Sequence, residues 1–115
     1  MKLEVYEKGE YQVISIEEDL TVISELQELS YLVDGYIAQG KRRIAVQFLK
    51  ASYIYSGAIA VLLQCIKKLT QDDGELCVIE NNPDIINIFQ TLKLDKVINI
   101  YESEDKLPEL FGVGP

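Results

Sequence analysis

The chain has 115 residues, a net charge of −8 and no histidine. This length predicts a single domain, residues 1–115, with a hydrophobic core of its own. The negative charge argues against nucleic acid or anionic membranes as partners, because both require a basic face, and the lack of histidine removes the usual general base and the commonest metal ligand.

Two short strands open the chain. Leu3 and Val5 predict the first, and residues 11–16 predict the second. The simplest connection is a hairpin across Lys8-Gly9-Glu10. Ser15 interrupts the apolar alternation of the second strand, which leaves its register open.

A helix is expected next. From Leu26 to Ile37, apolar residues recur at steps of three and four, which indicates an amphipathic helix. Ser24, with Gln27 three residues later, predicts a capping box at its start. Gly40 follows the last periodic residues and predicts its end.

The remaining chain alternates strands and helices. The expected elements are a strand at 44–48, a helix at 59–69, a strand at 75–79, a helix at 85–92 and a strand at 97–101. Asp72-Asp73-Gly74 ends the second helix, and Asn82-Pro83-Asp84 has the cap, proline and acid typical of a helix start. A further helix from Ser103 would meet Pro108, so we expect it to be short or broken.

This alternation predicts an α/β fold with a mixed, mostly parallel sheet of four to five strands. The sheet would carry the N-terminal hairpin and three to four helices. We expect residues 111–115 to be frayed. The chain has no apolar run long enough to span a membrane and no signal peptide at its start, so we expect a cytoplasmic protein without membrane insertion.

Other chemical groups point to structural roles. Lys41-Arg42-Arg43 is the only basic cluster, and we expect it to help end a helix and solvate a loop. Cys65 and Cys77 lie far apart in apolar runs, which predicts buried, reduced thiols. We therefore expect no metal site and no cofactor.

The turn Ser56-Gly57-Ala58 is the most plausible functional position. Sites in open α/β sheets form beyond the carboxyl ends of the strands, and the first amides of a helix attract anions. Catalysis has little support, because the Gly-x-Ser-x-Gly and phosphate-loop patterns are absent and the acids at 17–19 and 72–73 are adjacent and diverge. We therefore predict that the protein is not an enzyme.

Two roles remain open for Ser56. Its hydroxyl could cap the second helix, or it could accept a phosphate at the positive end of that helix. Tyr53 and Tyr55 also have two interpretations: anchors for a partner, if exposed, or packing at the end of the strand.

Four segments in order carry a family resemblance. These are SIEEDL (15–20), YIYSGAIAVLL (53–63), DGELCVIENNPDIINIFQTLKLDKVINIY (73–101) and ESEDKL (102–107). Together they resemble the STAS domain, the fold of bacterial anti-sigma factor antagonists, over roughly residues 13–107. Leu94-Asp95-Lys96 is the most specific local match.

The resemblance implies a protein-interaction module in partner-switching regulation. In regulated members a serine-kinase-like anti-sigma factor phosphorylates the second serine of Asp-Ser-Ser-Gly. Gly57 stands at that serine here, Tyr55 at the aspartate and Ala58 at the glycine, while Ser56 matches the first serine. The resemblance therefore predicts partner binding without the usual phosphoswitch, and Ser56 is the remaining candidate for modification.

The predicted partner-binding residues are Asp19, Tyr53, Tyr55, Ser56, Gly57 and Ala58. One alternative is an accessory subunit of a bacterial lipid-transport ABC complex, because Ser56-Gly57 resembles the Thr-Gly of such STAS subunits, and its partner would be an ABC ATPase. Another is a STAS domain that senses a small ligand. We expect a monomer or a weak dimer.

Overall fold

The computed structural model describes residues 2–22 and 26–109. The strands are β1 (Leu3–Lys8), β2 (Tyr11–Ile16), β3 (Arg43–Phe48), β4 (Glu75–Ile79) and β5 (Ile100–Tyr101). The helices are α1 (Gln27–Ala38), α2 (Ser56–Gln71) and α3 (Pro83–Thr91), with short 3₁₀ turns η1 (Leu94–Lys96) and η2 (Glu104–Lys106). None of the helices formed by these residues has the length and apolar content needed to cross a membrane.

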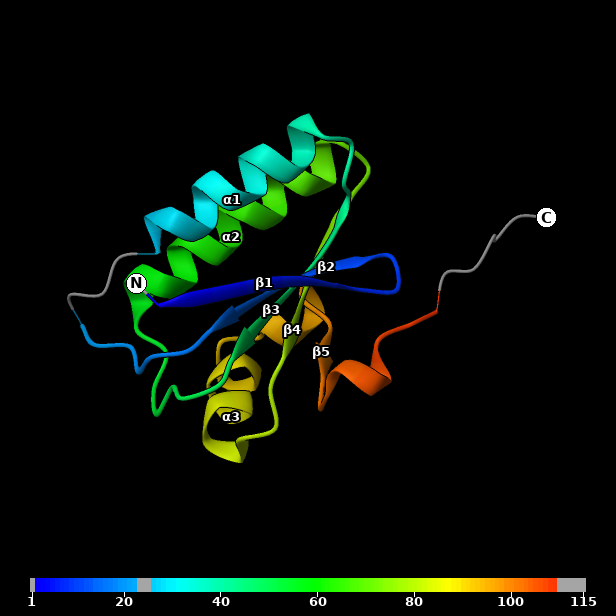
Figure 1. Cartoon of the computed structure of the whole chain (residues 1–115). Helices are drawn as coiled ribbons and strands as arrows, with labels where there is room; N and C mark the ends of the chain where they lie inside the picture. The colour runs from blue at the N-terminus through cyan, green and yellow to red at the C-terminus, as the bar shows by residue number, and fades with distance from the viewer. Residues whose placement is uncertain (1, 23–25, 110–115) are drawn as a thin grey trace.

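The strands form one five-stranded sheet in the order β1-β2-β3-β4-β5 (Figure 1). β1 pairs antiparallel with β2, and each of the other neighbouring pairs is parallel. The predicted hairpin and the mixed, mostly parallel sheet are therefore confirmed. Parallel strands end at the same edge of a sheet, so the loops that follow β2, β3 and β4 meet at its carboxyl edge.

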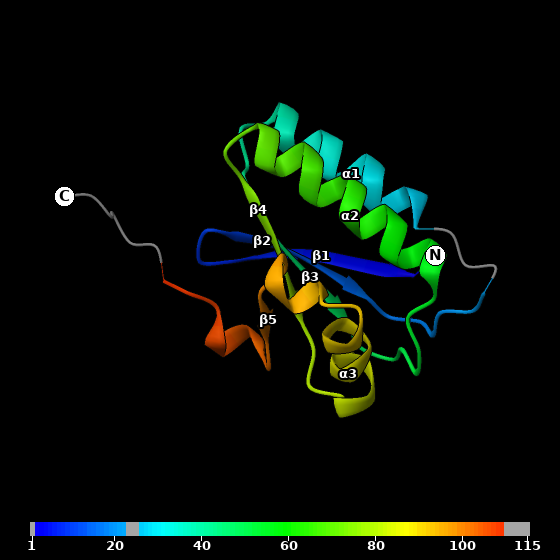
Figure 2. The ribbon, with the colours of Figure 1, turned by 180° about the vertical axis from the view of Figure 1, so that it is seen from behind.

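One face of the sheet, the inner face, carries the main core beneath the helices. α1 and α2 lie side by side over it, as both views show (Figures 1 and 2). Ile14, Val46 and Val78 from successive strands belong to the same buried cluster as Leu62 of α2 and Phe89 of α3. Burial of such apolar side chains is the main driving force for this arrangement.

The opposite, outer face carries a smaller core. Val13, Ala45 and Cys77 form it together with Leu107, which lies just after η2. The segment after β5 runs on the side of the sheet away from α1 and α2 (Figures 1 and 2). Ser15 also faces outward, which settles the open register: the alternation continues through Ser15, whose side chain is buried although it is polar.

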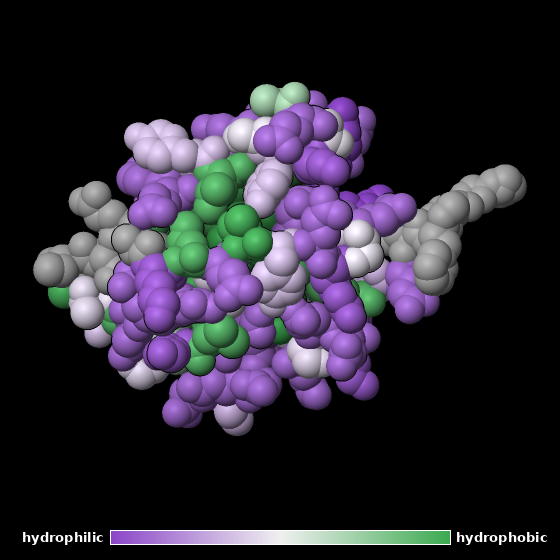
Figure 3. Space-filling view, viewed as in Figure 1, coloured by the Kyte–Doolittle hydropathy of each residue, from purple (hydrophilic) through white to green (hydrophobic). Residues whose placement is uncertain are grey.

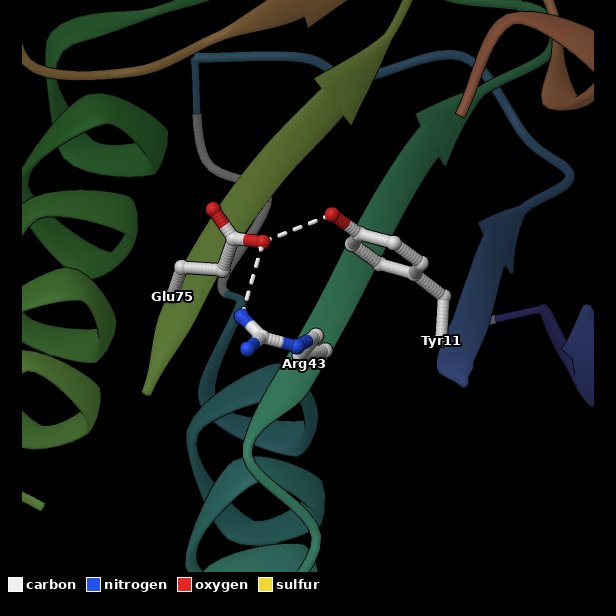
Figure 4. A network of polar contacts seen from close by, with 3 residues as sticks. All are labelled: Tyr11, Arg43 and Glu75. Atoms are coloured by element: carbon white, nitrogen blue, oxygen red, sulfur yellow. Dashed lines mark hydrogen bonds and ion pairs between the residues drawn. The ribbon is translucent and has the colours of Figure 1, made fainter. Parts of the chain in front are cut away.

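Tyr11, Arg43 and Glu75 form a polar network at the amino ends of β2, β3 and β4 (Figure 4). Arg43 pairs with Glu75 in register, and Tyr11 and Arg43 each directly precede the paired residues Gln12 and Ile44. The Tyr11 hydroxyl donates to Glu75 Oε1 at 2.6 Å, and Arg43 Nη1 lies 3.2 Å from the same oxygen. Burial and the Glu75 carboxylate raise the pKa of the Tyr11 phenol, so it stays a hydrogen-bond donor.

Hydrophobic side chains reach the surface in a strip between α1 and β1 on the face shown in Figure 3. β1 is an edge strand. Leu3 of β1 and Leu32 of α1 are partly buried against the core, and Val5 is exposed. Leu3 and Leu32 therefore mark the margin of the inner core, at the side of α1 that faces β1.

The predicted helix ends agree in part with the structure. Gly40 has φ +78 just after α1, and Asn82 Oδ1 accepts from the Asp84 amide at 3.0 Å at the start of α3. After α2, Asp73 takes the left-handed conformation with φ 59, whereas Gly74 does not. The Ser24 capping box and the 111–115 tail lie outside the described residues.

The last strand is shorter than predicted. Residues 97–99 are not in a strand, because η1 delivers the chain to the sheet only at Ile100. Val97 is exposed, whereas Ile98 is buried in the inner core. The expected terminal helix is the single turn η2, consistent with Pro108 close behind it.

The basic cluster after α1 is more tightly paired than a solvated loop would be. Lys41 lies 3.8 Å from Glu7, and Arg42 lies 3.1 Å from Asp72. Lys41 thereby contacts β1, and Arg42 contacts the C-cap residue of α2. The two cysteines are buried and unpaired with each other, as predicted, and burial raises their thiol pKa to about 11 for Cys65 and about 12 for Cys77.

Candidate functional site

The candidate site is the turn between β3 and α2, at the carboxyl edge of the sheet. Tyr55 is the N-cap of the 16-residue helix α2, with extended φ −85 and ψ 158, and its side chain makes no capping hydrogen bond. Ser56 is therefore the first helical residue, and its predicted role as the N-cap is wrong. The cap falls one residue earlier, at Tyr55. The Tyr55 backbone is still extended, but its carbonyl already accepts the first helical hydrogen bond, from the Ile59 amide at 3.1 Å.

The turn is open to solvent at its centre. Ser56 and Gly57 are exposed, so a partner can reach the first backbone amides of α2, which lack intrahelical acceptors. Ala58 is buried in the inner core. Its methyl group anchors the helix and is not available to a partner, unlike the two residues before it.

Two tyrosines lie beside the turn. The Tyr53 and Tyr55 rings are 4.8 Å apart between centroids, inclined at 55°. Tyr53 is 49% exposed and Tyr55 is half-buried, while Ile54 between them is buried in the core. Ile54 thus holds the extended link against the core, and the tyrosine pair both packs on itself and presents an aromatic surface.

Asp19 joins the loop after β2 to the loop after β3. Its Oδ1 accepts from the Ser52 amide at 2.9 Å, and its Oδ2 accepts from the Ser52 hydroxyl at 2.9 Å. These hydrogen bonds, the backbone one above all, lower the pKa of the Asp19 carboxyl below its usual value. The exposed carboxylate is therefore a clamp that holds the two loops side by side.

The same two loops contain apolar residues that the motif comparison did not single out. Leu49 follows β3 and Val22 lies beyond Asp19, and both side chains are exposed. The Leu49 amide donates to the Ile16 carbonyl at 3.0 Å, which fixes the start of its loop against β2. The only sequence signal for Leu49 was an apolar residue just past the end of a strand.

No set of three or more acidic, cysteine or histidine side chains converges to hold a metal ion in the described ranges 2–22 and 26–109. The candidate site itself contains hydroxyls, aromatic rings and free amides. These groups suit binding of a protein surface or an anion.

The family model for the STAS domain matches residues 2–107. The chain belongs to the STAS domain family. The match covers both loops of the candidate site and all five strands.

Solved structures share this fold at low identity. The NMR structure of the protein TM1081 aligns with a TM-score of 0.77 and 13% identity, covering 92% of this chain and 85% of that one. An anti-sigma factor antagonist from Mycobacterium paratuberculosis aligns at 0.74 and 16%, covering 90% and 87%. The Bacillus cell fate determinant SpoIIAA in its phosphorylated form aligns at 0.63 and 16%, covering 90% and 95%. No curated protein matches the sequence.

Proposed function

We propose that this STAS domain is a non-enzymatic, cytoplasmic interaction module that works like an anti-sigma factor antagonist. Its partner would be an anti-sigma factor with a serine-kinase-like fold. The observation that carries the proposal is the exposed start of α2 at Ser56-Gly57, flanked by the Tyr53–Tyr55 pair. The fold that this chain shares with the anti-sigma factor antagonist from Mycobacterium paratuberculosis and with SpoIIAA supports the proposal.

The partner would dock on the carboxyl edge of the sheet. Tyr53 and Leu49 offer exposed apolar area, and the free amides of α2 offer hydrogen-bond donors. The Asp19–Ser52 clamp holds the two loops in place before the partner arrives, which lowers the entropy cost of binding.

The usual phosphoswitch would be missing. The residue at the position of the modified serine is Gly57, which has no hydroxyl. Ser56 is exposed, but it stands one position earlier and follows Tyr55 where the motif has an aspartate. We therefore expect constitutive binding, with little or no phosphate on Ser56 after incubation with the kinase partner and ATP.

Truncation of Tyr53 tests the docking surface. Tyr53→Ala should weaken binding to the host's anti-sigma factor by about 2 kcal/mol, because aromatic anchors dominate such interfaces. Isothermal titration calorimetry measures the change. Leu92→Ala is the control: Leu92 is 52% exposed and is the C-cap of α3, so it belongs to neither loop and its loss should leave affinity unchanged. Equal losses for both variants would contradict the proposed surface.

A second candidate function is that of an accessory subunit of a lipid-transport ABC complex. The Ser56-Gly57 pair favours it, since it resembles the Thr-Gly of those STAS subunits and needs no phosphorylation. The neighbouring genes separate the two functions. A permease and an ATPase beside this gene would favour the transport role, and a kinase or phosphatase would favour partner switching.

A further inference from the structure

A groove follows the carboxyl edge of the sheet, from the outer face at Ser15 to Ile98 and Ile100, which belong to the inner-core side. It consists of three adjoining cavities of about 440, 270 and 340 Å³. The first two share Gln47 and Asn81 as lining residues, and all three share Glu102. We call this continuous space the acidic groove.

The lining of the acidic groove is strongly anionic. Its carboxylates are Glu4, Glu17, Glu80, Asp95, Glu102 and Glu104. Among the described residues that line it there is neither lysine nor arginine. Arg42 and Arg43 form their ion pairs at the opposite, amino edge of the sheet, so they do not neutralise the charge of the groove.

Two buried oxygens in the groove lack hydrogen-bond partners. Ser15 is 2% exposed and its Oγ has no partner, and Glu80 is 6% exposed and its Oε2 has none. Ser15 lies between Glu4 and Gln47 in one cross-strand row, so its hydroxyl lies on the floor of the first cavity. Buried polar atoms normally find a partner, and a ligand that brings donors would supply it.

Two carboxyl groups of the groove have pKa values raised above the usual value. A hydrogen bond with Glu17 and the charge of Glu17 raise the pKa of Glu4. Burial raises the pKa of Glu80, although Glu80 Oε1 accepts from the Asn81 and Asn82 amides at 3.1 and 3.0 Å. A cation in the groove would favour the ionised form of both acids.

The acidic groups of the groove are spread out rather than gathered at one point. No three acidic side chains of the described residues converge as metal ligands, and the carboxylates of the groove are distributed over its three cavities. An extended organic cation with several separated ammonium groups fits this distribution, since each ammonium offers three donors. Ser15 Oγ and Glu80 Oε2, in different cavities, are then two separate acceptor positions.

We propose that the acidic groove binds a linear aliphatic polyamine. One ammonium group would lie at Ser15 between Glu4 and Glu17, and another at Glu80 and Glu102. This site is separate from the proposed docking turn and does not depend on the function assigned to that turn.

Titration of the full chain with spermidine tests the proposal at constant ionic strength. Amide chemical shifts in NMR should change saturably at Ser15, Asn81 and Glu102. Glu102→Gln should weaken spermidine binding about three- to tenfold, as expected for loss of one charge-assisted contact. Glu10→Gln is the matched control, because Glu10 is exposed in the hairpin at the far end of β1 and β2.

Ser15→Ala gives a second readout. The substitution removes a buried oxygen that has no partner in the free protein, so the fold should be retained while spermidine binds less tightly. An unchanged affinity would overturn the role given to Ser15.

Three further results would overturn the proposal. They are the absence of saturation, shift changes spread evenly over the acidic surface, and equal weakening by Glu10→Gln and Glu102→Gln. Tighter binding of a trilysine peptide than of spermidine would assign the groove to lysine side chains of a protein and would also overturn it.

Discussion

In the proposed function, Gly57 is the residue that removes the usual phosphorylation position. It is exposed at the start of α2, and its backbone is not in the left-handed region. A Cβ built there meets no atom within 4 Å. Nothing in the fold therefore requires glycine at residue 57, and the absence of a hydroxyl is a chemical rather than a steric property of the turn.

Gly57→Ser should restore a phosphorylation site without harming the fold. We expect stability to stay equal or to rise by about 0.5 kcal/mol, because glycine is the poorer helix residue. Urea unfolding measures this change, and mass spectrometry after incubation with the kinase partner should find phosphate on the new serine. The double variant Ser56→Ala, Gly57→Ser is the control for the modified position. Full phosphorylation of Ser56 in the unmodified chain would contradict the missing phosphoswitch.

The exposed Asp19 carboxylate joins the two loops of the candidate site through its hydrogen bonds with Ser52. The hydrogen bonds from Ser52 lower its pKa in the folded state. A folded-state pKa below the unfolded value means that the ionised clamp stabilises the fold above the usual pKa of 3.8. This contribution is lost as the pH falls through the lowered value, so the two loops are held together throughout the neutral range.

At the scale of elements, the connection from α2 to β4 depends on a close backbone approach. The Gly74 amide donates to the Leu69 carbonyl at 2.6 Å, and the Glu75 amide donates to the Arg42 carbonyl at 2.8 Å. A Cβ on residue 74 would lie 2.5 Å from that Arg42 oxygen. The glycine is required because the start of β4 packs directly against the segment that leads into β3.

Two glycine-to-alanine substitutions should therefore have opposite effects. Gly74→Ala should destabilise the domain by about 1–3 kcal/mol, because the backbone must shift to relieve the overlap. Gly35 lies exposed within α1, where an added Cβ meets nothing within 4 Å, so Gly35→Ala should stabilise by about 0.5–1 kcal/mol. Urea denaturation of both variants measures the pair. A neutral Gly74→Ala would show that the contact with Arg42 does not constrain the turn.

At the scale of the whole molecule, the sheet is covered unequally on its two faces. Three helices cover the inner face, whereas the described cover of the outer face includes Leu107 after η2. Each core contains one cysteine: Cys65 lies in the inner core and Cys77 in the outer core. The outer cover is short, so it is the part most easily opened.

Leu107→Ala should open the outer face selectively. The loss of a buried leucine at the margin of the core should cost about 2 kcal/mol. Cys77 should then react with a thiol reagent faster than in the unmodified protein, while the rate at Cys65 stays the same. Mass spectrometry of partially labelled protein gives both rates at once. Equal acceleration at both cysteines would indicate global unfolding instead of local opening.

The elements with strong local signals could be predicted from the sequence. The hairpin around Gly9, the end of α1 at Gly40 and the start of α3 at Asn82 all depend on backbone preferences and hydrogen bonds within a few residues. The candidate turn was also predictable as a position, because it joins a strand-like run to a helix-like run at the carboxyl edge of a parallel sheet.

Other features depended on contacts between distant segments. The sequence alone left the face of Ser15 undecided, and pairing with β1 and β3 placed it beneath the acidic groove. Local propensity favoured Ser56 as the cap, but the path of the link from β3 put Tyr55 there. The partnership of Asp19 with Ser52 joins residues 33 positions apart.

The sequence by itself determined the fold class, the order of the elements and the location of the turn, because hydrophobic periodicity and helix-end chemistry act over short range. Only the tertiary structure decided which side chains of that turn are exposed and which carboxylates share a groove. Burial and charge proximity depend on the packing of segments that are remote in the chain, and local patterns do not encode that packing.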